Sequence, residues 1–385
     1  MNFQLNEEQR MLKQLAHDLG EKEWRGLEKE WEEKSQHIPK EYHKKLADLG
    51  LIGITFPVKY GGQGLGILEA VLVTEEGGRV STRVGRDIFE SNLGAAKAIE
   101  QLGTEEQKEK YLPLICKGEY QATMAMTEPE AGSALTDLQT RAVLKDNYYV
   151  VNGQKTFITG APECELYVLF ARFSEEPGAR GIGALIIERD TPGVSFGPEQ
   201  HFMGMHAPRC QIFFDDCHVP KENLIVGAGG FRQLITAFDT QRCGNAANSL
   251  GIAQGAFEIA LQYSQERRQF GRPICEFQAI QFMLAEMVMR IEAARLLLYR
   301  GAINAGTGLA RPYEAMVAKC FANEAVREVT SKAVEIMGGY GYSKEYPVER
   351  MFRDGWGYGF GGGTIEMQKI SIASELLGRR FSQRR

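Results

Sequence analysis

The chain has 385 residues, of which 45 are Lys or Arg and 50 are Asp or Glu, so the formal net charge is −5 at neutral pH. Apolar residues make up 43% and charged residues 25%, the usage of a folded globular protein, which excludes disordered, collagen-like and coiled-coil chains. A chain without a basic excess lacks the positive field that binds a phosphate backbone, so nucleic acid is not an expected partner.

Targeting and metal-binding signals are also missing from the sequence. No run of about 18 uninterrupted apolar residues could span a bilayer, and residues 1–7 lack the basic start and apolar middle of a secretory signal. The seven cysteines form no C-x-x-C pair, and the six histidines are dispersed, which is typical of buried free thiols rather than a metal site. We therefore expect a soluble, cytoplasmic protein with no metal and no membrane partner.

The first part of the chain is predicted to be helical and the next part β-structured. Residues 5–114 are rich in Glu, Lys, Leu and Ala, with the spacing of amphipathic helices at residues 41–49. After Gly118, short β-prone runs occur at residues 148–151, 166–171, 184–187 and 212–214. Turn signals separate these runs at residues 152–153, 160–162 and 191–193. Because no helices lie between the runs, they predict a small antiparallel sheet or barrel rather than β-α-β units.

The last part of the chain returns to helical patterning beyond Gly227. One helical face carries the apolar residues Ile280, Leu284, Met287, Val288, Ile291, Ala294 and Leu298. Residues 313–336 continue in the same style, which predicts long helices packed as a bundle. The predicted fold class is therefore α+β: a helical domain (residues 1–121), a small antiparallel β domain (residues 122–226) and a C-terminal helical bundle (residues 227–385).

Glycine-rich segments do not predict a Rossmann fold here. Gly357, Gly359 and Gly362 satisfy the spelling G-x-G-x-x-G, but no strand precedes them and no acidic residue follows in a β-α-β setting. Residues 61–64 are better explained as a turn between helices.

Two signatures near opposite ends of the chain resemble those of acyl-CoA dehydrogenases. Residues 124–133 read Met-Ala-Met-Thr-Glu-Pro-Glu-Ala-Gly-Ser, and residues 337–354 contain Met-Gly-Gly-Tyr-Gly-Tyr followed by Glu-Arg and Arg-Asp. Residues 155–160, 238–242 and 266–271 complete the family's order and spacing across nearly the whole chain. The family's three-domain fold agrees with the helical, β, helical order predicted above.

The resemblance implies that the protein binds FAD, whose charged linker and polar ring edge need hydroxyls, backbone donors and cations. Thr127 and Thr159 would bond the isoalloxazine edge, Phe157 would pack beside the ring in place of the Trp more usual in the family, and Ser133 would meet the pyrophosphate. Further cofactor-binding residues implied in this way are Arg267, Gln269, Phe270, Gly338, Gly339 and Thr364. The first five of these would come from a neighbouring subunit, which implies a homotetramer or homodimer.

The substrate implied by the resemblance is an acyl-CoA thioester. Phe238, Asp239 and Arg242 would hold the CoA arm. Members of the family usually abstract the α-proton with a glutamate that precedes a Gly-Thr pair, and Gly362 occupies that position here. Some branches place the glutamate directly before the arginine that is Arg242 here, but that residue is Gln241, a neutral amide. Both usual positions therefore lack a base.

A third acidic candidate lies in the N-terminal part, in the sequence Arg86-Asp87-Ile88-Phe89-Glu90. Branches acting on cyclohexenecarbonyl-CoA-type substrates resemble this chain in lacking the usual glutamate, and in them Glu90 would be the base. The branch that removes sulfite from sulfinopropionyl-CoA resembles it in Arg86, in Gln241 and in the glycines before Thr364; there Arg86 would bind the sulfinate. Taken singly, Arg86 and Glu90 could equally be a solvated helical pair.

The leading hypothesis is an FAD-dependent oxidoreductase of a CoA thioester with a cyclic or unsaturated acyl group, in which Glu90, Arg86 and Gln241 act at the reacting centre and Gly362 lines the substrate pocket. Electrons would pass to an electron-transfer flavoprotein. The alternatives are sulfite elimination without net redox, an enoyl-CoA reductase working in the opposite direction, and an inactive homologue that still binds FAD and CoA.

Overall fold

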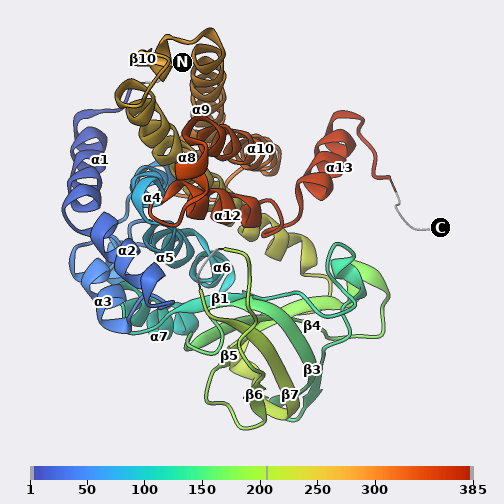
Figure 1. Ribbon diagram of the computed structural model, residues 1–385. Helices are drawn as coiled ribbons and strands as arrows, with labels where there is room; N and C mark the ends of the chain where they lie inside the picture. Colours follow the sequence, from blue (N-terminus) through green and yellow to red (C-terminus); the bar gives the residue numbers. More distant parts are fainter. Residues whose placement is uncertain (1–3, 205–206, 382–385) are drawn as a thin grey trace.

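A computed structural model describes residues 4–204 and 207–381 and has the three-part order predicted from the sequence (Figure 1). The N-terminal helices are α1 (Glu7–Leu19), α2 (Arg25–Glu33), α3 (Lys40–Asp48), α4 (Ile67–Val80), α5 (Thr82–Leu93), α6 (Ala95–Leu102) and α7 (Glu105–Cys116). The α-helices that follow the sheet are α8 (Phe231–Glu266), α9 (Gln278–Ala305), α10 (Pro312–Met337), α11 (Gly339–Tyr342), α12 (Val348–Tyr358) and α13 (Ile365–Leu376). The predicted fold class is confirmed, including the helices expected at residues 280–298 and 313–336.

The sheet between the two helical parts has the strand order β6-β7-β3-β2-β4-β5-β8, with β1 paired to β4. Its strands are β1 (Ala122–Ala125), β2 (Arg141–Lys145), β3 (Tyr148–Thr159), β4 (Leu166–Arg172), β5 (Ile182–Glu188), β6 (Val194–Phe196), β7 (Arg209–Pro220) and β8 (Leu224–Val226). A separate two-stranded ribbon, β9 (Arg268–Gln269) and β10 (Arg272–Pro273), follows α8.

The structure corrects two details of the predicted β domain. The sheet is mixed rather than wholly antiparallel, because β1 pairs with β4 in the parallel sense. The turn expected at Asn152 and Gly153 lies inside β3, where the register against β7 shifts between Val151 and Gly153. Such a bulge inserts one residue and bends the strand. Gly153 is needed there because a Cβ at this position would lie 2.6 Å from Thr140 Oγ1.

Glycines allow α4, α5 and α8 to cross in backbone contact. A Cβ built on Gly78 would lie 2.6 Å from the carbonyl oxygen of Asn248, and one on Gly85 would lie 2.6 Å from the backbone nitrogen of Gly78. Real Cβ atoms do not approach other atoms so closely, so side chains are excluded from this crossing. α5, which begins after the N-cap Ser81, is thereby held at a fixed depth against α8.

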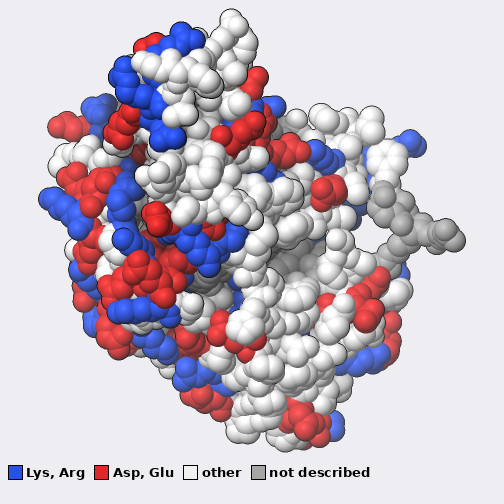
Figure 2. All heavy atoms as spheres, viewed as in Figure 1, with Lys and Arg blue, Asp and Glu red and all other residues white. Residues whose placement is uncertain are grey.

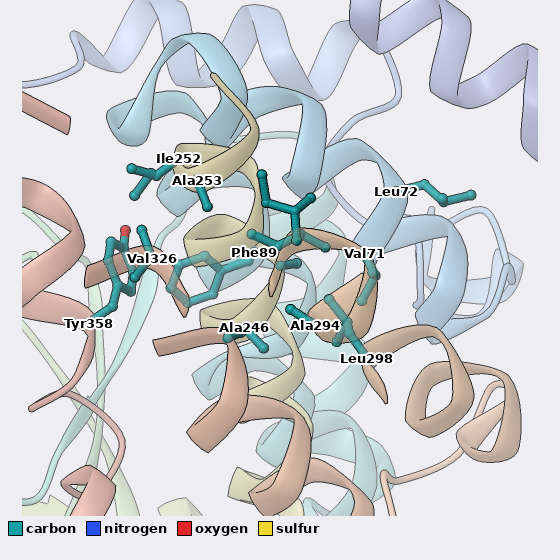
Figure 3. Packing of buried hydrophobic residues seen from close by; sticks show 14 of the residues in the cluster. Val71, Leu72, Phe89, Ala246, Ile252, Ala253, Ala294, Leu298, Val326 and Tyr358 are labelled. Atoms are coloured by element: carbon teal, nitrogen blue, oxygen red, sulfur yellow. The ribbon is translucent and has the colours of Figure 1, made fainter. Parts of the chain in front are cut away.

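The main core lies among the same helices and their C-terminal neighbours (Figure 3). Side chains from α4, α5, α8, α9, α10 and α12 meet there, and the labelled ones are Val71, Leu72, Phe89, Ala246, Ile252, Ala253, Ala294, Leu298, Val326 and Tyr358. Burial of such side chains is worth about 1.5–3 kcal/mol for each large apolar residue. The core therefore fixes α5 and α8 relative to the C-terminal bundle.

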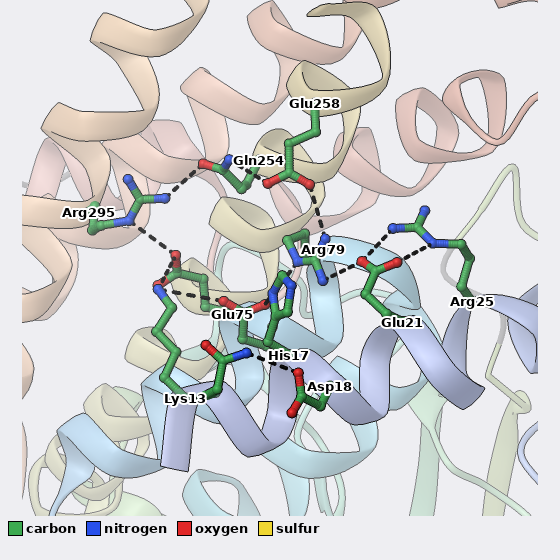
Figure 4. A network of polar contacts seen from close by, with 12 residues as sticks. Lys13, His17, Asp18, Glu21, Arg25, Glu75, Arg79, Gln254, Glu258 and Arg295 are labelled. Atoms are coloured by element: carbon green, nitrogen blue, oxygen red, sulfur yellow. Dashed lines mark hydrogen bonds and ion pairs between the residues drawn. The ribbon is translucent and has the colours of Figure 1, made fainter. Parts of the chain in front are cut away.

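A polar network ties α1 to the same bundle (Figure 4). Glu75, which is 2% exposed, accepts hydrogen bonds from Lys13 at 3.2 Å, Arg295 at 3.1 Å and the Tyr299 hydroxyl at 2.6 Å. Burial works against ionisation of Glu75, but these two cations and the hydroxyl outweigh it and lower its pKa. The carboxylate thus joins α1, α4 and α9.

Basic and acidic side chains are interspersed on the face seen in Figure 2, where they gather mainly over the N-terminal helices. No helix within residues 4–204 and 207–381 is long and apolar enough to cross a membrane.

Candidate active site

A pocket forms where α5 meets the edge of the sheet. Arg86 and Glu90 of α5 line it together with Thr159 and Gly160 at the end of β3. Other lining residues are His37, Ile38, Asp87, Ser91, Gln121, Ala122, Thr123, Glu163, Cys164 and Pro208. The structure therefore brings the acidic candidate from the N-terminal part to the residue predicted for the flavin edge.

Glu90 is held by a residue 151 positions away. Gln241 Nε2 of α8 donates a hydrogen bond to Glu90 Oε1 at 3.0 Å. The other carboxyl oxygen lies against Gly94, where a Cβ would be 2.5 Å from Glu90 Oε2. Burial raises the pKa of Glu90, and the Gln241 hydrogen bond and the charges of Arg86 and Arg209 only partly oppose it. A raised pKa brings this carboxyl closer to the range in which it can both accept and return a proton near neutral pH.

Gln241 also faces the glycine that occupies the first of the two base positions. A Cβ built on Gly362 would lie 3.2 Å from Gln241 Oε1, and this amide oxygen is buried without a hydrogen-bond partner among the described residues. One side chain thus separates Glu90 from Gly362. A substrate group entering here would meet an open acceptor on Gln241.

Arg86 lies beside Glu90 with a buried Nε that has no hydrogen-bond partner in the described part of the chain. Its neighbour Asp87 belongs to a separate group, in which Asp87 Oδ2 lies 2.7 Å from His43 Nδ1 and Asp87 Oδ1 accepts from Gln121 Nε2 at 3.0 Å. Burial opposes ionisation of Asp87, but His43 and Arg86 lower its pKa. Because Asp87 is engaged by His43 and Gln121, Arg86 keeps hydrogen-bonding capacity for a ligand.

The signature loop of residues 126–140 is clamped to β3 by a buried ion pair. Lys155 Nζ lies 2.8 Å from Glu128 Oε1 and donates to the carbonyl of Met126 at 3.0 Å. Burial lowers the pKa of Lys155 to about 8, and Glu128 opposes this shift. The backbone N–H of Thr156 donates to the carbonyl of Thr127 at 2.9 Å. These contacts place Thr127 beside the residues that flank Phe157.

Phe157 is presented to solvent by a strained backbone. Its φ is +59°, in the left-handed region that costs a non-glycine residue about 1–2 kcal/mol, and the residue is 55% exposed. Its N–H donates to Gln200 Oε1 at 3.2 Å, and its ring meets that of Phe202 edge-on at 5.9 Å. Strain kept at an exposed aromatic residue indicates a functional position.

Comparison with known proteins assigns the chain to a family. The family models described as acyl-CoA dehydrogenase N-terminal, middle and C-terminal domains match residues 6–119, 123–217 and 228–377. The chain belongs to the acyl-CoA dehydrogenase family. It is thereby one of the FAD-dependent oxidoreductases that act on CH–CH groups.

Relatives of this chain carry different activities in their names. The caffeyl-CoA reductase-Etf complex subunit CarC of Acetobacterium woodii is 40% identical over 374 residues, which cover 97% of this chain and 99% of that protein. The 3-sulfinopropanoyl-CoA desulfinase of Paraburkholderia xenovorans is 38% identical over 390 residues, covering 100% and 99%. The structure of butyryl-CoA dehydrogenase from Megasphaera elsdenii has a TM-score of 0.94 at 38% identity, covering 98% of this chain and 100% of that one.

The residues of the chain fit FAD. Thr127 and Thr159, expected at the ring edge, are partly exposed, and Ser133 and Phe157 are exposed. An exposed aromatic side chain together with accessible hydroxyls suits a planar ring with a polar edge. Thr127, Thr159 and Phe157 would hold the ring and Ser133 the pyrophosphate.

The residues predicted for a neighbouring subunit's flavin lie elsewhere in the chain. The β9–β10 ribbon with Gln269 and Phe270 is far from the sheet (Figure 1), and Phe270 is 93% exposed. Arg267 lies over the ring of Tyr340 at 5.8 Å, and Tyr340 directly follows Gly338 and Gly339 in the sequence. The two segments predicted to reach a second flavin therefore lie side by side. Their role stays a prediction.

The predicted CoA-binding residues are buried in α8. Asp239 and Arg242 form an ion pair with each other, and Phe238 packs under the Arg242 guanidinium at 5.6 Å. Arg242 Nε also donates to the carbonyl of Gly362 at 3.3 Å. In this arrangement the three side chains position the glycine loop before Thr364, which is the N-cap of α13. Their contact with CoA stays a prediction.

Two functional candidates were missed in the sequence. Lys319 of α10 is fully buried and donates to the carbonyl of Gly363 at 2.9 Å and to Asn323 Oδ1 at 3.0 Å. Burial, with a smaller effect of Arg242, lowers its pKa to about 7. Arg209, the first residue of β7, is 5% exposed and donates to Thr159 Oγ1 at 3.1 Å. The only sequence signal for Arg209 is a cation at the start of an apolar strand.

Proposed function

We propose that this member of the acyl-CoA dehydrogenase family acts on a CoA thioester with a cyclic or unsaturated acyl group, and that Glu90 moves the proton at that group. The hydrogen bond between Glu90 and Gln241 carries the proposal, since Gln241 links this carboxyl to the Gly362 position where a base is usual. Within the pocket, Glu90 is the carboxyl whose pKa is raised.

In the proposed reaction, FAD held by Thr127, Thr159, Phe157 and Ser133 would supply the two-electron acceptor for the substrate's hydride. Gln241 fixes the orientation of the Glu90 carboxyl, and the remaining lone pairs of the carboxylate accept a proton from carbon. Because Glu90 lies one side chain beyond Gly362, the proton it takes is remote from the thioester carbonyl, as in a vinylogous elimination. The same carboxyl, once protonated, returns the proton in the opposite direction by microscopic reversibility, which accommodates a reductase.

The electron partner proposed is an electron-transfer flavoprotein, supported by the relative named for its Etf complex. We further propose a homo-oligomer in which Arg267, Gln269, Phe270, Gly338 and Gly339 complete the flavin site of a neighbouring subunit. The exposure of Phe270 and the open space around Gly338 and Gly339, where an added Cβ would meet nothing within 4 Å, support this arrangement.

Glu90→Gln tests the proposal, because it keeps the side-chain shape and removes the titrating group. The variant should bind FAD as the parent does but lose at least about 100-fold in the rate of flavin reduction by a cyclic or unsaturated acyl-CoA, the usual value of a general base. Glu188→Gln on β5, where the carboxylate pairs with Lys110 on the surface, is the control. Reduction at the parent rate in a flavin-loaded Glu90→Gln variant would remove Glu90 from the mechanism.

Sulfite elimination is the second candidate. It is favoured by the 38% identical desulfinase and by Arg86 Nε, which has no hydrogen-bond partner within residues 4–204 and 207–381. Arg86 would bind the sulfinate as a charge-assisted fork. The C–S bond would break, water would supply the proton to carbon and the oxygen to sulfur, and no net oxidation would occur.

Anaerobic mixing of the yellow protein with a panel of thioesters separates the candidates. Bleaching of the flavin by a neutral acyl-CoA supports oxidation, whereas sulfite release without bleaching supports elimination and should fall sharply in Arg86→Gln. A protein that binds FAD and CoA thioesters but gives neither signal would be an inactive homologue.

A further inference from the structure

Arg209 stands at the junction of the sheet and the α5 pocket. It is paired in register with Thr159 across the antiparallel strands β3 and β7, so their side chains project from the same face of the sheet. The backbone holds this register on both sides, with Gly160 N–H donating to the carbonyl of Pro208 at 2.8 Å and Gln200 N–H donating to the carbonyl of Arg209 at 2.7 Å.

The contact with Arg209 sets the direction of the Thr159 hydroxyl. A hydroxyl has one proton and two lone pairs. Arg209 Nε donates to Thr159 Oγ1 at 3.1 Å, which uses a lone pair and leaves the hydroxyl proton to be donated elsewhere. Thr159 lines the pocket, so its proton is available to an acceptor atom at the edge of a bound ring.

The Arg209 guanidinium is itself held in place. It lies 4.8 Å over the ring of Phe202, an attractive cation–π geometry, and Phe202 packs against Phe157. Arg209, Phe202 and Phe157 thus form one cluster of contacting side chains, and Arg209 also contacts Thr159. A side chain fixed in this way needs little reorganisation when charge develops next to it.

Arg209 has a second cation, Arg86, in its surroundings. Burial and the like charge of Arg86 lower the pKa of Arg209 to about 10, while Glu90, Asp354 and Tyr358 oppose the shift, so the guanidinium stays charged at neutral pH. Two neighbouring cations in a site of low dielectric favour a ligand that becomes negative.

We propose that Arg209 is a positioning residue that, through Thr159 Oγ1, presents a fixed proton donor and a fixed positive charge to the edge of the flavin and so stabilises its reduced, more negative form. This inference rests on the proposed placement of the flavin at Thr159. It adds to the proposed function a residue that sets the electron affinity of the cofactor rather than moving the substrate proton.

Arg209→Gln removes the charge and keeps a hydrogen-bond donor, and its test is a redox titration of the bound flavin against a reference dye. We expect the ratio of oxidised to reduced flavin at a fixed potential to rise at least tenfold, which for a two-electron couple is a potential about 30 mV lower. Arg209→Lys keeps the charge, so its flavin reduction potential should stay closer to that of the parent protein. Arg141→Gln is the control, because this β2 arginine pairs with Glu175 on the exposed side of the same sheet.

Thr159→Val shows whether the effect passes through the hydroxyl. If it does, Thr159→Val should also lower the potential, and the double variant should lower it by less than the sum of the two single changes. If Arg209→Gln loses its flavin while Arg209→Lys and Arg141→Gln retain theirs, this result would also support a requirement for a cation at position 209 in the flavin site. A flavin-loaded Arg209→Gln with the parent potential would overturn the inference and leave the proposed function standing, whereas a parent protein that binds no flavin would overturn both.

Discussion

Lys319 allows a quantitative test of how the glycine loop before Thr364 is held. Its ammonium is fully buried beneath the loop, bonded to the carbonyl of Gly363 and to Asn323, and its pKa falls from 10.5 to about 7. Since the unfolded chain binds this proton up to about pH 10 and the folded chain releases it near pH 7, the unfolded state binds more protons between these values. The stability that Lys319 contributes therefore rises with pH in this window and is lost as pH falls through 7.

The size of the effect follows from the shift. Integrating the linkage relation for these two pKa values gives about 3 kcal/mol of added stability between about pH 6 and about pH 9. Lys319→Met keeps the length of the side chain but cannot titrate. The difference in free energy of unfolding between the parent and Lys319→Met should therefore change by about this amount across the window, in favour of the parent at high pH.

Denaturant unfolding of both proteins at a series of pH values measures this difference directly. Lys369→Met is the control, because Lys369 lies on the surface of α13 and pairs with Glu324, so its difference from the parent should stay nearly constant. A parent-to-Lys319→Met difference that is equally constant would show that Lys319 keeps its ordinary pKa, and the reasoning from burial would be wrong.

Two further outcomes are expected from the geometry. Gly362→Glu should lower the free energy of unfolding by about 1–2 kcal/mol, because φ at this position is +72°, and the variant should oxidise simple saturated acyl-CoA substrates. The control Gly362→Ala should lose similar stability in denaturant unfolding and gain no activity. A folded, flavin-loaded Gly362→Glu variant without that activity would mean that the pocket shape also differs. Glu75→Gln should destabilise the protein by about 1.5–3 kcal/mol at neutral pH, because Lys13, Arg295 and Tyr299 lose their charge-assisted hydrogen bonds to this carboxylate, while Lys13 keeps Glu76 and Arg295 keeps Glu292. Because the pKa of Glu75 is lowered on folding, its stabilising effect is lost in acid. In thermal unfolding, the difference in stability between the parent and Glu75→Gln should therefore narrow as pH falls below 4.5. A difference in stability that does not change with pH would contradict the lowered pKa.

The order of the helical and β parts could be predicted because hydrophobic periodicity is a local signal. The spacing from Ile280 to Leu298 predicted α9, and the β-prone run at residues 166–171 predicted β4. Strand β1, residues 122–125, was missed because it is short, and its pairing partner β4 follows only after about 40 residues of intervening chain. Gly153 gave a turn signal inside β3 because glycine is favoured in both bulges and turns.

The candidate site was only partly accessible from the sequence. Glu90 could be proposed from the family resemblance, which implies base positions at Gly362 and Gln241 that cannot accept a proton here. The contact between Glu90 and Gln241 could not be predicted, because it joins residues 151 positions apart and no local sequence pattern contains it. Lys319 was missed because a lysine in an alanine-rich helix ordinarily indicates a solvent-exposed face. Burial beneath a loop 44 residues further along the chain leaves no trace in periodicity.

The glycine crossing of α4, α5 and α8 fixes the backbone of one wall of the pocket. With Gly78 and Gly85 in backbone contact, no side chain at the crossing can be shortened to let α5 shift, so the backbone that carries Arg86 and Glu90 stays in place. New room for an acyl group must come from the opposite wall, where Thr159, Cys164 and Pro208 line the pocket. Laboratory evolution toward bulkier thioesters should therefore collect its substitutions on the sheet side and spare the helices.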